Sequence, residues 1–244
     1  MLEHKLSRAE IRSIVSVPAG SITEGARDEM AIPSYLHPNP LVRWLFWKRY
    51  EIVAQLSELN EQKTVLEFGC GIGMFLPTLS ARVKQVFAID LFPQYAQELV
   101  RRLELGSKVA FARDIDDIPD DSLDLIVAAD VLEHIADPRS LVTAFRRKLK
   151  MNGRLVVSGP TENRLYKLGR ALAGFGDKGD YHVTNIDRLE TDIRQSGYKH
   201  LQVVHLPFRF LPSLFKIHKF ANASQAVTET TGSRSSVVPS LICA

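Results

Sequence analysis

Cysteine is scarce in this chain of 244 residues, which contains only Cys70 and Cys243. Two cysteines cannot build the disulfide framework of a small secreted protein, so a reducing compartment suits the chain and the cytoplasm is its expected location. An excess of one charge is also missing, since 31 basic side chains stand against 28 acidic ones and the net charge is +3. This balance does not support a dedicated nucleic-acid binder, and we expect no nucleic acid among the partners.

Long apolar runs are missing as well. The most apolar stretch, residues 65–81, is too short to cross a membrane and is interrupted by Glu67, three glycines and a proline. The first ten residues, MLEHKLSRAE, carry charges where a signal peptide needs an apolar core. We therefore expect a soluble protein or one that is peripheral to a membrane.

The composition that remains is that of a globular protein, with 45% hydrophobic and 24% charged residues. At about 150 residues per domain, the length suggests one domain with terminal extensions. Residues 1–38 lack sustained periodicity and are interpreted as an N-terminal arm or lid. Residues 39–220 form the expected domain, opened by a helix with Asn39 as its N-cap and Pro40 in its first turn. Residues 221–244 read as a tail, in which 236–244 could add a last edge strand.

From residue 63 onward, short apolar runs alternate with helical segments. Apolar strands that alternate with helices belong in a parallel sheet covered on both faces. The sequence therefore predicts an α/β fold with a doubly wound, mostly parallel sheet. The expected strands are TVLEFG, QVFAID, VAFARD, LDLIVAAD, GRLVVSG and LQVVHL.

A glycine-rich turn follows the first of these strands, in the segment LEFGCGIG. Gly69, Gly71 and Gly73 allow a sharp turn and a close approach of a ligand to the backbone, which indicates a cofactor crevice; a tight turn without a ligand is the alternative. The dinucleotide spacing G-x-G-x-x-G is not met, because Met74 stands at the sixth position counted from Gly69. Glu67 would repel a pyrophosphate but attract an amino group, so a ligand with a cationic amino-acid end fits better.

Acidic residues also end the next two strands. Asp90 follows VFAI and can accept hydrogen bonds from both hydroxyls of a ribose. Asp114 follows VAFAR and can accept a proton from an exocyclic amine, while Ile115 offers an apolar contact to a purine. Together with Glu67, these residues describe an adenosine that carries an amino-acid tail.

Four segments in this order resemble the class I S-adenosylmethionine-dependent methyltransferases, in the branch that includes ubiquinone and menaquinone biosynthesis enzymes. They are LEFGCGIG, AID, ARDIDDIPDDSLDLIVAADVLEHI and RKLKMNGRLVVSGP, and the likeness covers roughly residues 63–200. The resemblance implies a Rossmann-like fold, S-adenosylmethionine as cofactor, S-adenosylhomocysteine as product and a small-molecule methyl acceptor. The residues that it assigns to the cofactor are Glu67, Gly69, Gly71 and Gly73 at the methionine end, Asp90 at the ribose, Leu91, Asp114 and Ile115 at the adenine, and Asp130.

His134, in the segment Asp130-Val131-Leu132-Glu133-His134, is the candidate catalytic residue. It lies just beyond a strand at the same edge, and an imidazole suits proton transfer at neutral pH. A role in packing and loop geometry is the alternative. A metal site formed by Asp130, Glu133 and His134 with a distant His182 is a further one, and we expect no metal. The segment also lacks the Asn/Asp-Pro-Pro-aromatic motif of enzymes that methylate nucleic-acid bases.

The acceptor side is expected in the long insertion after residue 159. Tyr166, Tyr181 and His182 are the candidate substrate contacts there, because such loops usually carry specificity. Two stretches, residues 43–50 and 208–220, mix aromatic and basic side chains. They suit either an anionic membrane surface, a cap over a hydrophobic acceptor, or a face packed on the core with solvated charges.

The sequence thus predicts a methyltransferase acting on a small molecule, with lipid, isoprenoid and glycan intermediates as candidates and oxygen favoured as the methylated atom. A sensor or scaffold that binds S-adenosylmethionine without turnover is the alternative. A nicotinamide-dependent oxidoreductase is a weaker one, because Met74 and Glu67 disfavour it.

Overall fold

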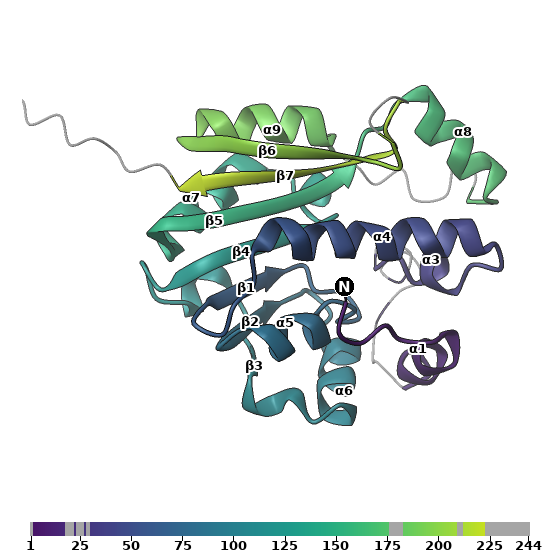
Figure 1. Ribbon diagram of the computed structural model, residues 1–244, viewed down its shortest axis with the longest axis horizontal. Helices are drawn as coiled ribbons and strands as arrows, with labels where there is room; N and C mark the ends of the chain where they lie inside the picture. Colours follow the sequence, from purple (N-terminus) through teal and green to yellow (C-terminus); the bar gives the residue numbers. More distant parts are fainter. Residues whose placement is uncertain are drawn as a thin grey trace, which may run out of the picture.

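A computed structural model describes residues 2–17, 22, 27, 30–175, 183–208 and 212–222 of the chain. Its centre is a seven-stranded sheet with the strand order β3-β2-β1-β4-β5-β7-β6 (Figure 1). All neighbouring strands are parallel except that β7 runs antiparallel to both β5 and β6. The strands are β1 (Thr64–Phe68), β2 (Gln85–Ile89), β3 (Val109–Phe111), β4 (Leu123–Ala129), β5 (Leu149–Pro160), β6 (Tyr198–Leu206) and β7 (Phe215–Asn222).

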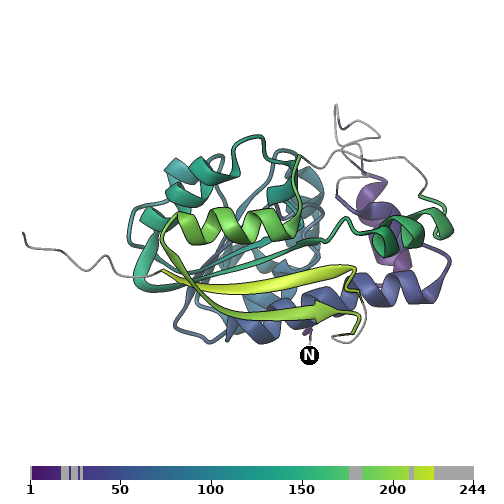
Figure 2. The same cartoon turned by 90° about the horizontal axis from the view of Figure 1, so that it is seen from above.

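Helices cover both faces of the sheet, as the apolar strands require (Figures 1 and 2). Successive side chains of a strand point to opposite faces, so Leu125 and Val127 of β4 belong to the core that also contains residues of α4, α5 and α6, whereas Ile126 belongs to the core that contains residues of α7 and α9. The doubly wound, mostly parallel α/β sheet predicted from the sequence is confirmed. The helices of this sandwich are α4 (Pro40–Ser57), α5 (Leu76–Arg82), α6 (Gln94–Arg102), α7 (Pro138–Lys148) and α9 (Ile186–Gln195), with short 3₁₀ turns η1 (Leu105–Ser107), η2 (Ile115–Asp117) and η3 (Leu132–His134).

The order of the strands indicates at which edge of the sheet a ligand would bind. The chain runs from β1 outward to β3 and then returns to the other side of β1 as β4. Ligands of such sheets bind at the carboxyl ends of the strands where this reversal occurs. The crevice between β1 and β4 is therefore the expected site, and the glycine turn directly follows β1.

The N-terminal segment contains two helices that the hydrophobic pattern did not indicate, α1 (Arg8–Val15) and α3 (Ile32–Leu36). Ile11 and Ile14 of α1 are buried in the core on the α6 side. A signal was present in the sequence, because Ser7 and Glu10 form a capping box that starts α1, with Ser7 N–H donating to Glu10 Oε2 at 2.7 Å. The division into arm, domain and tail stays a prediction.

Helix α4 begins as the sequence predicts. Asn39 is its N-cap, accepting the N–H of Leu41 at 2.9 Å, and Pro40 occupies the first turn, where its missing N–H is harmless. This helix crosses one face of the sheet and carries Arg49 and Tyr50 into the core. The stretch 43–50 is therefore divided between a buried side and a solvent side that includes Trp44 at 44% exposure.

The interfacial and acceptor-cap interpretations of residues 208–220 are wrong for their second half, which forms β7. Phe215, Ile217 and Phe220 are buried, and β7 is hydrogen-bonded on both sides, by β5 and β6. Lys219 is not solvated either, since it is buried and pairs with Glu58 at 2.7 Å. Phe215 and Phe220 pack into the core on opposite faces of the sheet, because successive side chains of this central strand meet different helix layers. The edge strand considered for 236–244 lies outside the described residues.

His218 of β7 gives the fold a pH dependence. It lies on the α9 side, with Nδ1 3.1 Å from Nε2 of His200 on β6. Burial, and then the charges of His200 and Lys216, lower the pKa of His218 to about 4, against which Asp187 acts only weakly. Because the pKa in the unfolded chain is near 6.5, the unfolded state binds the proton more tightly. The contribution of His218 to the free energy of unfolding is thus fully present above about pH 6.5 and is lost, by up to ~3 kcal/mol, as the pH drops toward 4.

Urea unfolding of the protein and of the His218→Gln variant between about pH 7 and pH 4 measures this effect. The variant lacks the titrating imidazole, so its free energy of unfolding is expected to fall less steeply below pH 6.5. Parallel curves for the two proteins would contradict the assignment.

Candidate functional site

The site begins at the glycine turn after β1. Gly69 and Gly71 both have positive φ, at 73° and 54°, in the left-handed region that favours glycine. A Cβ on Gly69 would lie 2.4 Å from Cγ2 of Val131, so only glycine lets the turn approach the exit of β4. At Gly71 the nearest neighbour of a Cβ would be Met30 at 3.8 Å. Gly73 turns away from the crevice and packs against α6 through Leu99.

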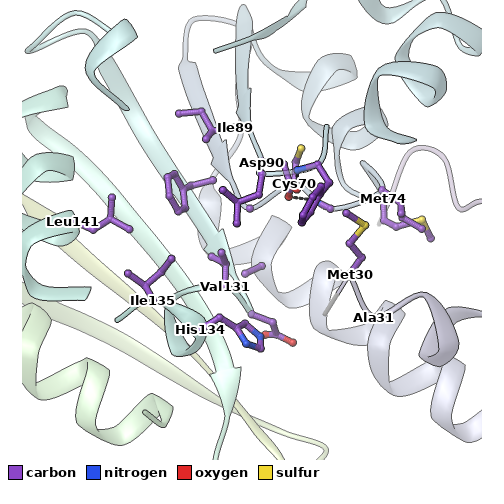
Figure 3. A pocket seen from close by; sticks show the side chains of 18 of the residues that line it. Met30, Ala31, Cys70, Met74, Ile89, Asp90, Val131, His134, Ile135 and Leu141 are labelled. Carbon is purple, nitrogen blue, oxygen red and sulfur yellow. Dashed lines mark hydrogen bonds between the residues drawn. The ribbon is translucent and has the colours of Figure 1, made fainter. Parts of the chain in front are cut away.

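A cavity of about 370 Å³ opens along the carboxyl ends of β1, β2 and β4 (Figure 3). Eight of the residues predicted for the site line it: Gly69, Gly71, Asp90, Leu91, Asp114, Ile115, Asp130 and His134. Glu67, Gly73 and Tyr166 do not line it. Tyr181 and His182 lie outside the described residues. The fold thus gathers into one wall acids that are far apart in the sequence.

Asp90, at the exit of β2, faces the glycine turn. Its Oδ2 accepts the N–H of Gly71 at 2.7 Å, and its Oδ1 accepts the N–H of Phe92 at 2.9 Å. These bonds fix the carboxylate at the cavity wall while each oxygen keeps a lone pair free for a ligand. Such a carboxylate can accept hydrogen bonds from two neighbouring hydroxyl groups of a ligand.

The other end of the cavity is apolar with a carboxylate at its margin. Leu91 is 87% exposed and stands in the cavity wall with Ile115. Asp114 caps η2, with its Oδ1 accepting the N–H of Asp116 at 3.1 Å. A flat aromatic group with an exocyclic amine would cover the apolar side chains and reach Asp114.

Glu67 lies behind the wall, at the end of β1. Its side chain is buried, and its Oε2 has no hydrogen-bond partner. Burial, and then the charge of Asp90, raise the pKa of Glu67 well above its ordinary value. A buried carboxyl that lacks a partner is costly unless something neutralises it or bonds to it. Glu67 therefore places an unused hydrogen-bond acceptor, Oε2, at the base of the glycine turn.

The sequence reasoning missed Arg49. This α4 residue lines the cavity, is 2% exposed and forms an ion pair with Asp130. Asp130 has a positive φ of 54°, and its Oδ1 accepts the hydroxyl of Ser158 at 2.6 Å. Nothing local in the stretch 43–50 separates Arg49 from its basic neighbours, because only the packing of α4 across the sheet buries it.

His134 stands in the cavity wall on η3, as expected from its place after β4 (Figure 3). The neighbouring Glu133 is buried, and burial raises its pKa to about 7. The backbone carbonyl of Glu133 accepts the N–H of Val183 at 2.8 Å, which ties η3 to the segment before α9. In the described part of the chain, no group of three or more His, Cys, Asp or Glu side chains is arranged to hold a metal ion.

Tyr166 is on α8 (Arg164–Leu172), outside the cavity wall. Its ring packs edge-on against Phe215 with the centroids 5.7 Å apart. Burial raises the pKa of Tyr166 to about 12, so its hydroxyl stays protonated at neutral pH. A direct substrate contact by Tyr166 thus requires an acceptor that reaches beyond the cavity described here.

A family model described as a methyltransferase domain matches residues 43–203. Two curated relatives are the ubiquinone biosynthesis O-methyltransferases of Xanthomonas euvesicatoria pv. vesicatoria, 31% identical over 115 residues, and of Xylella fastidiosa strain M23, 34% identical over 116 residues. The first alignment covers 45% of this chain and 48% of the relative, and the second covers 46% and 44%. The chain therefore spans about half the length of the curated relatives that it matches.

Solved structures share the fold. The N-methyltransferase NodS from Bradyrhizobium japonicum WM9, in complex with S-adenosyl-L-homocysteine, is 21% identical with a TM-score of 0.61, over 82% of this chain and 98% of NodS. The [4+2]-cyclase SpnF is 15% identical with a TM-score of 0.63, over 91% of this chain and 98% of SpnF. A methyltransferase and a cyclase thus have the same architecture, which shows that the architecture alone does not fix the reaction.

Proposed function

Because this chain belongs to the class I S-adenosylmethionine-dependent methyltransferases, in the ubiquinone-like branch, we propose that it transfers a methyl group from S-adenosylmethionine to an oxygen of a small molecule. The observation that carries the proposal is the cavity wall itself. The glycine turn, Asp90 and Asp114 follow β1, β2 and β3 and stand in that order along one cavity.

The residues present fit this cofactor. Asp90 would accept both ribose hydroxyls, while Leu91 and Ile115 would hold the adenine and Asp114 its exocyclic amine. At the other end, the guanidinium of Arg49 in the cavity wall offers a positive charge to the carboxylate of the amino-acid group.

When bound, this cofactor supplies an electrophilic methyl group on a sulfonium. The protein then has to align the acceptor with that methyl group, a contribution that can reach roughly 7–11 kcal/mol. An acceptor hydroxyl must also lose its proton, and the imidazole of His134 in the cavity wall is the group we assign to that task. The relatives named as O-methyltransferases support oxygen as the methylated atom.

Isothermal titration and label transfer test the proposal. S-adenosylhomocysteine should bind and NADH should not, whereas the reverse result would identify a nicotinamide enzyme. A methyl label from S-adenosylmethionine should then appear in an acceptor from a cell extract. Extraction of the labelled product into organic solvent would identify a lipid or isoprenoid acceptor, and retention in water a glycan. Binding with no labelled acceptor would favour a sensor.

The His134→Ala variant tests the proton transfer. With the labelled acceptor fraction as substrate, we expect kcat to fall by roughly 100-fold, a common effect of removing a general base. The affinity for S-adenosylhomocysteine should stay unchanged, which serves as the control for the fold. A decrease in kcat below about threefold, less than 1 kcal/mol, would mean that His134 has only a structural role.

We also propose a peripheral contact with an anionic membrane, made by α8 and the first turns of α4. These helices lie at the same end of the molecule (Figures 1 and 2). In the described part of the chain, no helix is long and apolar enough to span a bilayer. Exposed apolar side chains on the two helices are Leu41, Trp44, Leu165, Leu168 and Leu172, with Arg43, Lys48, Arg164, Lys167 and Arg170 among them in the sequence.

Co-sedimentation with phosphatidylcholine vesicles, with and without phosphatidylglycerol, measures this contact. Binding is expected only with the anionic lipid, and the double variant Leu168→Glu/Leu172→Glu should weaken it by about tenfold or more, because it removes apolar burial and adds like charge. Met151→Glu is the matched control, since Met151 is 63% exposed at the opposite end of the sheet. Equal binding by all three proteins would contradict the assignment.

A further inference from the structure

Arg49 is a buried cation in an aromatic setting. The rings of Phe46, Tyr50 and Phe215 have their centroids 5.0, 5.1 and 5.7 Å from its Cζ, and its Nη2 donates to the hydroxyl of Tyr35 at 3.1 Å. Aromatic faces attract a guanidinium, but none of these rings carries a full negative charge. A charge this deeply buried is costly unless an anion is paired with it.

Asp130 is that anion. Its Oδ2 forms the ion pair with Arg49, and its Oδ1 accepts the hydroxyl of Ser158. The backbone is held as well, since the N–H of Asp130 donates to the carbonyl of Ser158 at 2.9 Å. Both carboxylate oxygens are thus engaged by protein groups, and the charge of Asp130 is directed at Arg49.

The pair lies at the glycine-turn end of the cavity. Val131, the next residue after Asp130, packs against Gly69 closely enough to exclude a Cβ there. Asp114 lies at the other end of the cavity, after β3. A ligand whose adenine lies near Asp114 would therefore bring its amino-acid carboxylate toward Arg49, where Asp130 already stands.

We propose that Asp130 is a built-in counter-ion that competes with the ligand's carboxylate for Arg49, instead of a residue that binds the ligand. The inference rests on the proposed function, because it needs a ligand with this carboxylate. Two carboxylates beside one guanidinium repel each other, so the charge of Asp130 stabilises the ligand-free protein and weakens the binding of a carboxylate-bearing ligand. Under this proposal Asp130 would not be one of the cofactor contacts, and its expected assignment to them stays a prediction.

The Asp130→Asn variant separates these roles. Asparagine tolerates a positive φ and can still accept the Ser158 hydroxyl, so chiefly the charge is removed. The two probes are S-adenosylhomocysteine, which has the amino-acid carboxylate, and 5′-methylthioadenosine, which lacks it. By calorimetry, the variant should bind S-adenosylhomocysteine about tenfold more tightly, with unchanged affinity for 5′-methylthioadenosine. Its melting temperature without ligand should be lower, and the rise on adding S-adenosylhomocysteine larger, than in the parent protein.

Arg49→Met and the double variant Arg49→Met/Asp130→Asn complete the cycle. Each should bind S-adenosylhomocysteine at least tenfold more weakly than the parent, and the double variant should bind no more weakly than Arg49→Met, because without Arg49 the charge of Asp130 can only repel the ligand's carboxylate. The double variant removes both charges together, so it remains informative if Asp130→Asn alone does not fold. Asp124→Asn is the matched control, since Asp124 is ion-paired with Lys150 at the opposite end of β4, and it should change neither affinity.

Two results would overturn the inference. Weaker binding of S-adenosylhomocysteine by Asp130→Asn would make Asp130 a direct ligand, and so would weaker binding by the double variant than by Arg49→Met. Failure of the parent protein to bind either probe would instead remove the proposed function.

Discussion

Asp90→Ala is expected to weaken the binding of S-adenosylhomocysteine by roughly 100-fold or more. The carboxylate is the only group at its position in the cavity wall that we assign to the two ribose hydroxyls, and hydrogen bonds to a charged acceptor contribute about 1.5–3 kcal/mol each. The substitution also removes the acceptor for the N–H groups of Gly71 and Phe92, so the glycine turn loses its link to the exit of β2.

Calorimetric titration measures this loss, with Asp124→Asn as the control. Asp124 is also a partly buried carboxylate that accepts a backbone N–H, from Thr64 at 2.8 Å, but it lies at the opposite edge of the sheet. A melting curve should show that the Asp90→Ala variant is folded. Binding within threefold of the parent protein would remove Asp90 from the site and with it the proposed orientation of the cofactor.

Gly69→Ala is expected to lower the free energy of unfolding by about 2–5 kcal/mol. Alanine at a φ of 73° is strained, and its Cβ would lie 2.4 Å from Val131 Cγ2 and 2.6 Å from Val131 Cβ. Because Val131 follows Asp130 directly, relief of this overlap requires the β4 exit to move away from the turn. Binding of S-adenosylhomocysteine should therefore weaken together with stability.

Urea unfolding compares this variant with Gly169→Ala, a glycine of α8 whose added Cβ meets nothing within 4 Å. That control should be neutral or more stable by up to ~1 kcal/mol, since alanine is the better helix former. A free energy of unfolding for Gly69→Ala equal to that of the control would contradict the packing argument.

Much of the site could be predicted because of how parallel sheets are built. Asp90 and Asp114 each follow a strand, and the carboxyl ends of adjacent parallel strands meet at one edge whatever the details of packing. The same argument predicted that His134 lies at this edge, because it follows β4 after a few residues, and His134 does line the cavity. The capping box of Ser7 and Glu10 is likewise a local signal, which can be read from the sequence. The hydrophobic pattern did not indicate helix α1 because this helix has only eight residues.

Other features could not be read in this way. Glu67 ends its strand like the other acids, yet its side chain is buried behind the cavity, because the glycine turn lies between them. The aromatic and basic stretch at 208–220 gave no sign of β7, since strand insertion between β5 and β6 depends on partners that are distant in the sequence.

The sequence by itself determined the family, the doubly wound sheet and the order of the cavity-lining residues along its edge, because all three follow from strand order and from short motifs. The tertiary structure alone decided which charges meet. Arg49 reaches Asp130 only because α4 packs across the sheet, 81 positions away along the chain. A pairing of that kind depends on packing between elements, for which no local pattern of residues is a sufficient signal.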